Sequence, residues 1–218
     1  MSLPIHTLSP PRPQDLQPLV GDLTLRKGRV QELCGPARLT LAALVMGKTQ
    51  GPVVWIRPGW LSDRLNAAGL QPMANPARLI LATAARDEAL LWAMEEALRS
   101  GTAPLVVAEV LAPPGLTPIR RLHLAAEAGS QAAHRDSTTA PIGLILLPGQ
   151  GGAQGVESRW HMTPRPSRSL LWSDEGSWTL TRLRARLAPP AAWALRRGVD
   201  GAETLDPQPL HPAPASGR

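Results

Sequence analysis

The chain reads VQELCGPARLTL from Val30 to Leu41. The apolar run that ends at Cys34 predicts a strand, Gly35-Pro36 predicts a tight turn, and the residues after the turn begin an apolar helix. Strand, turn and helix in this order are the local architecture of a phosphate-binding loop, but the loop itself is missing. Gly35 leads directly into the helix, and Arg38 stands in place of the Gly-Lys pair that a working loop carries.

The degenerate loop consists of Gly35, Pro36, Ala37, Arg38 and Thr40. It has no Lys, no hydroxyl in register for Mg²⁺, and too few residues between glycines for successive N–H groups to surround a phosphate. The later tripeptide at 47–49, Gly-Lys-Thr, resembles the end of the motif, but it follows the apolar helix. At a helix C-terminus the macrodipole repels anions, so we interpret the tripeptide as a helix stop.

Short apolar strands alternate with helices through the middle of the chain. The expected strands are 30–34, 52–56, 78–83, 104–110 and 142–147, and the expected helices are 36–46, 61–68, 86–100 and 117–128. Such alternation predicts an α/β fold with a mainly parallel sheet and helices on both of its faces.

The two ends of the chain differ from its middle. Residues 1–25 are Pro-rich and predict an extended arm, although Leu16, Val20 and Leu23 can still pack on the body. After Leu147, two strand-like runs cover 157–164 and 177–187 and predict an antiparallel edge of the sheet. The main domain is therefore expected at 26–193, followed by a flexible tail at 194–218.

Positive charge is concentrated in the C-terminal third. Residues 159–197 hold eight Arg and two acids, and their net charge of +6 equals that of the whole chain. Period-two counting from Trp178 places Arg182, Arg184 and Arg186 on one face of a strand, which predicts an arginine ladder. An acidic partner or a polyanion is expected to bind here. A strand of this kind also discourages aggregation between sheet edges, so the ladder alone does not decide between these roles.

Other classes of protein find little support in the sequence. The single cysteine, Cys34, excludes an internal disulfide and lies in an apolar run, as expected for a buried thiol in a cytoplasmic protein. No apolar stretch approaches the ~20 residues that span a bilayer. The five His residues are scattered without metal-ligand spacing, and no Ser lies in a nucleophile motif, so we expect no metal site and no hydrolase.

Several segments together resemble the core of RecA and, more closely, the ImuA family of RecA-like proteins from bacterial inducible-mutagenesis operons. They are Glu32-Leu33-Cys34-Gly35-Pro36, Val53-Val54-Trp55-Ile56, the run 87–101, Leu105-Val106-Val107-Ala108-Glu109-Val110, the run 120–127, Glu157-Ser158-Arg159-Trp160 and the run 184–190. The resemblance covers roughly residues 28–193. It implies a RecA-like three-layer sandwich.

The same resemblance implies that ATP chemistry has been lost. Arg57-Pro58-Gly59 stands where a RecA-type enzyme carries its catalytic glutamate, and neither Pro nor Gly can act as a general base. Only Glu109 remains, at the position of the Walker B acid. We expect Glu109 to accept a hydrogen bond or pair with an Arg rather than bind a metal. The resemblance therefore implies a protein that is not an enzyme and has no cofactor.

The resemblance also implies a function. A member of the ImuA family is expected to act as an adaptor in SOS-induced translesion DNA synthesis, with an ImuB-like Y-family protein and a DnaE-type polymerase as partners. RecA and a second copy of the chain are further partners that it allows. The candidate surface for a partner or for DNA consists of Arg159, Trp160, Trp178, Arg182, Arg184, Arg186 and Trp193. The alternatives are a DNA-binding or nucleotide-binding RecA paralogue and a SulA-like inhibitor of cell division.

Overall fold

The structure is a computed structural model that describes residues 12–136, 138–166, 176–198 and 200–210. Its strands and helices are, in chain order, β1 (Leu16–Val20), β2 (Leu23–Arg26), β3 (Val30–Cys34), α1 (Arg38–Gly47), β4 (Val53–Pro58), α2 (Ala67–Leu70), β5 (Leu79–Ala84), α3 (Asp87–Ser100), β6 (Leu105–Glu109), α4 (Leu116–Arg135), β7 (Ile142–Leu147), β8 (Ser158–Pro164), β9 (Gly176–Ala185), β10 (Ala191–Arg197) and β11 (Glu203–Gln208). Two short 3-10 turns cover Pro13–Asp15 and Pro76–Arg78.

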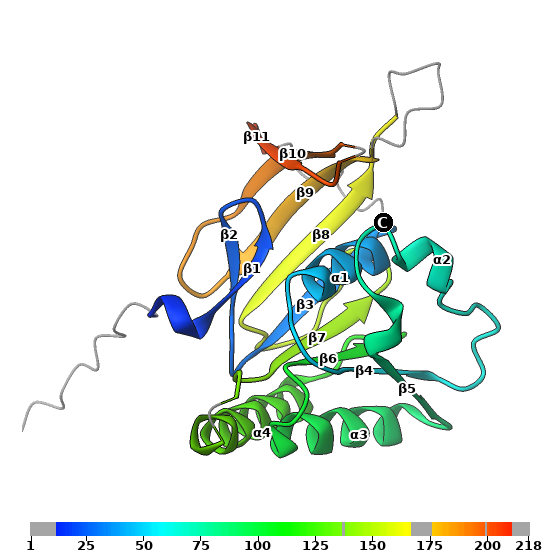
Figure 1. Ribbon diagram of the computed structural model, residues 1–218, viewed down its shortest axis with the longest axis vertical. Helices are drawn as coiled ribbons and strands as arrows, with labels where there is room; N and C mark the ends of the chain where they lie inside the picture. Colours follow the sequence, from blue (N-terminus) through cyan, green and yellow to red (C-terminus); the bar gives the residue numbers. More distant parts are fainter. Residues whose placement is uncertain (1–11, 137, 167–175, 199, 211–218) are drawn as a thin grey trace, which may run out of the picture.

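A nine-stranded sheet in the order β11-β10-β9-β8-β3-β7-β6-β4-β5 forms the centre of the molecule (Figure 1). The strands from β5 to β8 pair in parallel, and β9, β10 and β11 continue the sheet in antiparallel fashion. Helix α1 covers one face, and α3 and α4 cover the other. The expected three-layer α/β sandwich with an antiparallel C-terminal edge is confirmed.

Each face of the sheet has its own apolar core. On the α1 side, the core contains Trp55, Trp160 and the apolar residues of α1. On the other side, Leu90, Met94 and Leu98 of α3 pack on the sheet. Strands β3, β6 and β7 are buried along their whole length, as parallel strands covered on both faces must be.

The prediction of a helix at 61–68 is wrong. The structure has only the four-residue helix α2, and Asn66 precedes it as the N-cap, accepting a hydrogen bond from the Ala68 N–H at 3.0 Å. Asn favours a cap over a helix interior because its side chain can replace the missing backbone acceptor. Helix α4 extends seven residues beyond its expected end, whereas β7 matches the prediction.

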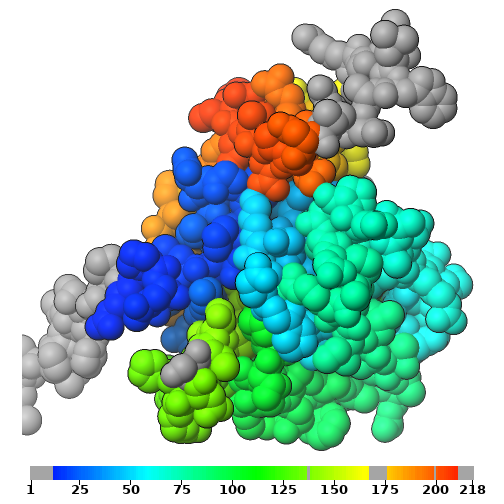
Figure 2. Space-filling model, in the orientation of Figure 1, coloured from blue at the N-terminus to red at the C-terminus, as the bar shows by residue number. Residues whose placement is uncertain are grey.

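The N-terminal region is more ordered than a Pro-rich arm. Residues 1–11 lie outside the described part, but β1 and β2 form an antiparallel hairpin. Leu19, Val20 and Leu25 are fully buried in the α1-side core, and the expected packing of Leu23 is also confirmed. The hairpin lies against the C-terminal strands (Figure 2), and a Cβ at Gly21 would stand 2.8 Å from a side-chain carbon of Leu205.

The flexible tail expected from residue 194 is wrong for the segments that form β10 and β11. Strand β10 pairs with β9 and β11 pairs with β10, and Leu195 is fully buried. Composition misleads here because an edge strand tolerates Pro as a tail does. The decisive signal is the alternation of Trp193 and Leu195 with small or charged neighbours. The expected disorder at 211–218 lies outside the described residues.

No helix among the described residues is both long and apolar enough to cross a membrane.

Candidate functional site

The turn between β3 and α1 packs directly against strand β8. Gly35 has a φ of 91°, a conformation that other residues rarely adopt. A Cβ at this position would lie 2.6 Å from the Met162 carbonyl oxygen and 2.8 Å from Nε2 of His161. The turn therefore requires glycine for two reasons, the backbone conformation and the close approach of β8.

Hydrogen bonds close this turn. The Ala37 N–H donates to the Met162 carbonyl at 3.0 Å, and the Arg38 N–H donates to the Gly35 carbonyl at 3.3 Å. The Arg38 side chain folds back, and its Nη1 also donates to the Gly35 carbonyl at 3.3 Å. A phosphate-binding loop needs such N–H groups free and pointing at the ligand. Two of the N–H groups at this turn are bonded to the protein instead.

The Walker-B-like acid is also engaged by the protein. Oε1 of Glu109 accepts a hydrogen bond from the Trp55 indole at 2.8 Å and lies 3.7 Å from Nε of Arg57. All three side chains are buried. The contacts expected for Glu109, an N–H donor and an Arg, are thus both present. Arg57 belongs to β4, which extends two residues further than expected. Because β4 pairs with β6, the Arg57 side chain lies beside Glu109 of β6.

A second buried carboxylate lies in β3, which is separated from β6 in the sheet by β7. Glu32 is fully buried; Arg159 Nε donates to its Oε2 at 2.7 Å and the Gly152 N–H donates to its Oε1 at 2.6 Å. The loop after β7 therefore folds onto the end of β3. A Cβ at Gly151 would stand 1.7 Å from Glu32 Oε1, so this loop also relies on glycine for close approach.

Two titratable side chains lie beside the turn, Cys34 fully buried and His161 partly buried. Burial, followed by the nearby Glu32 carboxylate, raises the pKa of the Cys34 thiol to about 12. Burial lowers the pKa of His161. A thiol of this kind remains protonated at neutral pH and is a poor nucleophile, as expected for Cys34 from the sequence.

The expected arginine ladder is wrong because β9 contains a bulge. Arg184 lies opposite Arg159 and Arg182 lies opposite Trp160, so Leu183 is an extra residue between them. The extra residue shifts the alternation of side chains by one. Arg182 shares a face with Trp160 and the α1-side core, whereas Arg184, opposite Arg159, lies on the other face, where Leu183 packs in the core under α3 and α4.

The candidate surface residues divide into two groups. Trp160 and Trp193 lie with ring centroids 6.0 Å apart, and the Arg182 guanidinium stands 5.5 Å and 5.3 Å from the two centroids. The structure thus brings these three together, with Trp178 half-buried against the same core. Trp160 itself is only 2% exposed, and Arg159 is committed to Glu32, so neither can serve as an exposed anchor.

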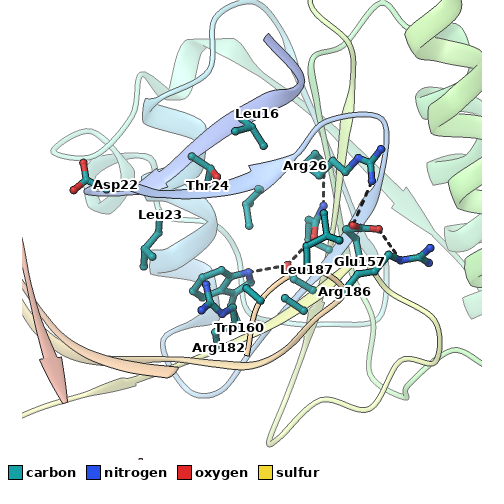
Figure 3. Close-up of a pocket in the computed structure, with 15 residues that line it drawn as sticks. Leu16, Asp22, Leu23, Thr24, Arg26, Glu157, Trp160, Arg182, Arg186 and Leu187 are labelled. Atoms are coloured by element: carbon teal, nitrogen blue, oxygen red, sulfur yellow. Dashed lines mark hydrogen bonds and ion pairs between the residues drawn. The ribbon is translucent and has the colours of Figure 1, made fainter. Parts of the chain in front are cut away.

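A cavity of about 220 Å³ opens between the hairpin and strands β8 and β9 (Figure 3). Its apolar wall includes Leu16, Leu23 and Leu187, and its floor is polar. On the floor the Trp160 indole donates to Ser158 Oγ at 2.7 Å, and Ser158 Oγ donates to Gln31 Oε1 at 2.7 Å. These polar groups satisfy one another, so the floor does not need a ligand.

Charged groups surround one end of the cavity. Glu157 is buried, and its carboxylate lies 3.8 Å from Arg26 Nη1 and 3.4 Å from Arg186 Nε (Figure 3). Its Oε2 has no hydrogen-bond partner among the described residues. Arg182 and Asp22 also line the cavity, so its lining has three Arg against two acids. The site therefore carries a net positive charge beside an apolar wall.

Sequence reasoning missed Glu32 and the hairpin side of this cavity. The signal for Glu32 was present, because Gln31-Glu32 is a polar pair inside an otherwise apolar strand and each buried polar group requires a partner. The sequence holds no signal for Arg26 and Leu16, because their contacts with β8 and β9 depend on how the hairpin folds back. Among the described residues, no group of three or more His, Cys, Asp or Glu is arranged to hold a metal ion.

Comparison with protein-family models and with curated proteins finds no match. Among solved structures, SulA from Pseudomonas aeruginosa is 25% identical over an alignment that covers 55% of this chain and 98% of that chain, with a TM-score of 0.42. A likeness of this degree carries no inference about function.

Proposed function

We propose that this protein is a non-enzymatic adaptor, in which a RecA-like fold is retained for its surfaces and no longer binds nucleotide. The observation that supports this most strongly is the closed turn at Gly35. Positioning and charge neutralisation supply nearly all of phosphoryl-transfer catalysis, and both depend on a loop that surrounds the phosphates. Here the Ala37 N–H is bonded to β8, and Glu109 is bonded to Trp55.

The cellular role in the proposal rests on the sequence resemblance to the ImuA family over residues 28–193. Accordingly, we propose that the adaptor acts in damage-induced translesion synthesis and contacts an ImuB-like Y-family protein and a DnaE-type polymerase. The geometry of the turn supports the loss of ATP chemistry, whereas the choice of partners depends on the resemblance alone.

The cavity between the hairpin and β9 is the partner surface that we propose. At about 220 Å³ it is smaller than the ~300–1,000 Å³ of common small-molecule sites, so it suits one apolar side chain of another polypeptide. Arginine, which lines the cavity at three positions, is enriched among interface anchors. Arg26, Arg182 and Arg186 favour acidic residues on either side of the inserted side chain.

The proposal is tested with the purified full chain and the purified ImuB-like protein and DnaE-type polymerase of the same organism. We expect direct binding to at least one of them in nuclease-treated samples. Leu187→Asp should weaken this binding at least tenfold, because it places a carboxylate on the apolar rim. Leu187 is 51% exposed, so the fold should tolerate the change.

Leu124→Asp is the matched control, since Leu124 is 66% exposed on α4, a helix of the opposite face. It should bind like the unmodified chain. Recovery of a cell-division protein without any polymerase component from damaged cells would contradict the adaptor role. Retention on DNA that falls steeply with salt would instead support the DNA-binding alternative.

A further inference from the structure

The outer strand of the parallel half of the sheet, β5, has one side without a partner. In the part of the chain that the structure describes, β5 pairs only with β4 and forms the end of the nine-stranded sheet (Figure 1). Alternate N–H and C=O groups of an edge strand point away from the sheet. Another extended strand satisfies such groups in a regular way.

The side chains of β5 make this edge apolar on both faces. Ile80 is 54% exposed and Leu81 is 58% exposed. Leu81 lies opposite Trp55 and therefore on the α1 face, and Ile80 lies opposite Val54 on the α3 face. A strand added beside β5 would cover both side chains at once, whereas a helix packed on one face would cover only one.

The two edges of the sheet are built differently. All six residues of β5, LILATA, are uncharged, and none is proline. At the other edge, β11 contains Glu203, Asp206 and Pro207, and its acids pair with Lys48 and Arg196. Charge and proline are the usual means by which proteins prevent further strands from pairing with an edge. The edge at β11 has this protection and the edge at β5 lacks it.

We propose that β5 is a self-association edge, where two copies of the chain pair antiparallel about a two-fold axis and form one continuous sheet. A two-fold axis normal to the sheet keeps each face on its own side. With Leu81 on the axis, Leu81 meets its copy, Ile80 lies opposite Ala82, and Leu79 lies opposite Thr83. The last two pairs place a large residue beside a small one, and no pair contains a charge.

A second copy fits this edge better than an unrelated strand. Partner choice at an edge strand is set by charges and by pockets for alternate side chains, and β5 itself carries no charge that would select a different sequence. Nothing in LILATA repels its own copy. Two-fold dimers are also the commonest symmetric assembly of soluble chains. This inference goes beyond the adaptor function and does not depend on it.

The first test is the molar mass of the full chain in solution, by light scattering on a sizing column. We expect a species of twice the 23.3 kDa of one chain. Leu81→Lys and Ile80→Lys should each raise the dimer dissociation constant by about 100-fold or more, because each loses apolar burial and brings in a charge. Both positions are exposed in the single chain, so thermal unfolding of a dilute sample should show the fold intact.

Leu124→Lys makes the same chemical change on α4 and should leave the dimer unaffected. A chain that is a monomer at every concentration that remains in solution would overturn the proposal. So would a dimer that persists in Leu81→Lys and Ile80→Lys.

The second test is a disulfide across the axis. Opposite Cα atoms in an antiparallel pair lie about 4.5–5.5 Å apart, within the range of a disulfide. Leu81→Cys should therefore form a covalent dimer under mild oxidation. The natural Cys34 is buried with a raised pKa and should not react. If Leu124→Cys cross-links equally fast, the link is collisional, which would contradict pairing through β5.

Discussion

At the scale of single residues, the buried pair of Glu32 and Arg159 joins three segments of the chain. Glu32 belongs to β3, Arg159 to β8, and the Gly152 N–H that also contacts the carboxylate belongs to the loop after β7. A buried charge is tolerated only when its partners are in place, since removal from water costs several kcal/mol. The pair thus holds β3, β8 and the loop after β7 together.

Replacement of Arg159 by Met should be strongly destabilising. The change leaves the Glu32 carboxylate buried with only the Gly152 N–H, which we expect to cost about 3 kcal/mol in urea denaturation. The matched control is Arg184→Met, at the position opposite Arg159 on β9, where the side chain is exposed. It should change the free energy of unfolding by about 0.5 kcal/mol or less. Equal effects for the two variants would contradict the role given to this ion pair.

His123 is a partly buried side chain that bridges two backbone groups. The Val30 N–H donates to Nδ1 at 3.3 Å, so the proton of the neutral ring is on Nε2, which donates to the Gly155 carbonyl at 3.1 Å. Burial lowers the pKa of His123 below its ordinary value. A proton added to Nδ1 would also remove the acceptor for Val30.

The stability of the protein should therefore fall in mild acid. Above the ordinary His pKa of about 6.5, neither the folded nor the unfolded chain carries this proton. As the pH falls below that value, the unfolded chain takes up the proton first, so the free energy of unfolding decreases. His123→Gln should flatten this slope between about pH 7 and pH 5. Parallel stability curves for the variant and the unmodified chain would show that His123 is not responsible.

At the scale of elements, the connection from β3 to α1 determines whether the fold can hold a phosphate. Strand β8 supplies the Met162 carbonyl that bonds to the turn, and no such strand contact is compatible with an open loop of N–H groups. The turn is therefore a packing feature between two parallel strands and one helix.

Gly35→Ala tests this packing. Its positive φ alone costs an L-residue about 1–3 kcal/mol, and the new methyl group would press on the Met162 carbonyl, so we expect a loss of at least about 2 kcal/mol in thermal or urea unfolding. Gly115→Ala is the control, because no atom lies within 4 Å of a Cβ at that position. It should cost about 1 kcal/mol or less. If Gly35→Ala left the free energy of unfolding unchanged, the turn would be open in solution.

Elements buried on both faces could be predicted from the sequence, and those stabilised by distant contacts could not. Strands β3, β6 and β7 are short apolar runs, and their positions agree with the prediction to within a residue. The bulge at Leu183 cannot be recognised from a period-two pattern, so the prediction of an arginine ladder was wrong. The hairpin is stabilised by the core beneath it, and its Pro-rich composition hid this.

At the scale of the whole molecule, the protein joins a parallel half, from β5 to β3, and an antiparallel half, from β9 to β11, with β8 between them. The parallel half contains the turn at Gly35 and the buried Glu109, whose two contacts were predictable because a buried acid needs donors. The cavity lies in the other half and was not predictable, because it forms only where the hairpin meets β8 and β9.

The central claim is that this fold no longer binds nucleotide, and the melting temperature in the presence of Mg·ATP tests it most directly. A ligand that binds only the folded chain raises its stability by about 2.7 kcal/mol at 100 times its dissociation constant, which is easily seen as a shift. We predict no shift with ATP, ADP or a non-hydrolysable analogue up to millimolar concentration, and no phosphate release. A saturable rise in melting temperature that requires Mg²⁺ would contradict the account.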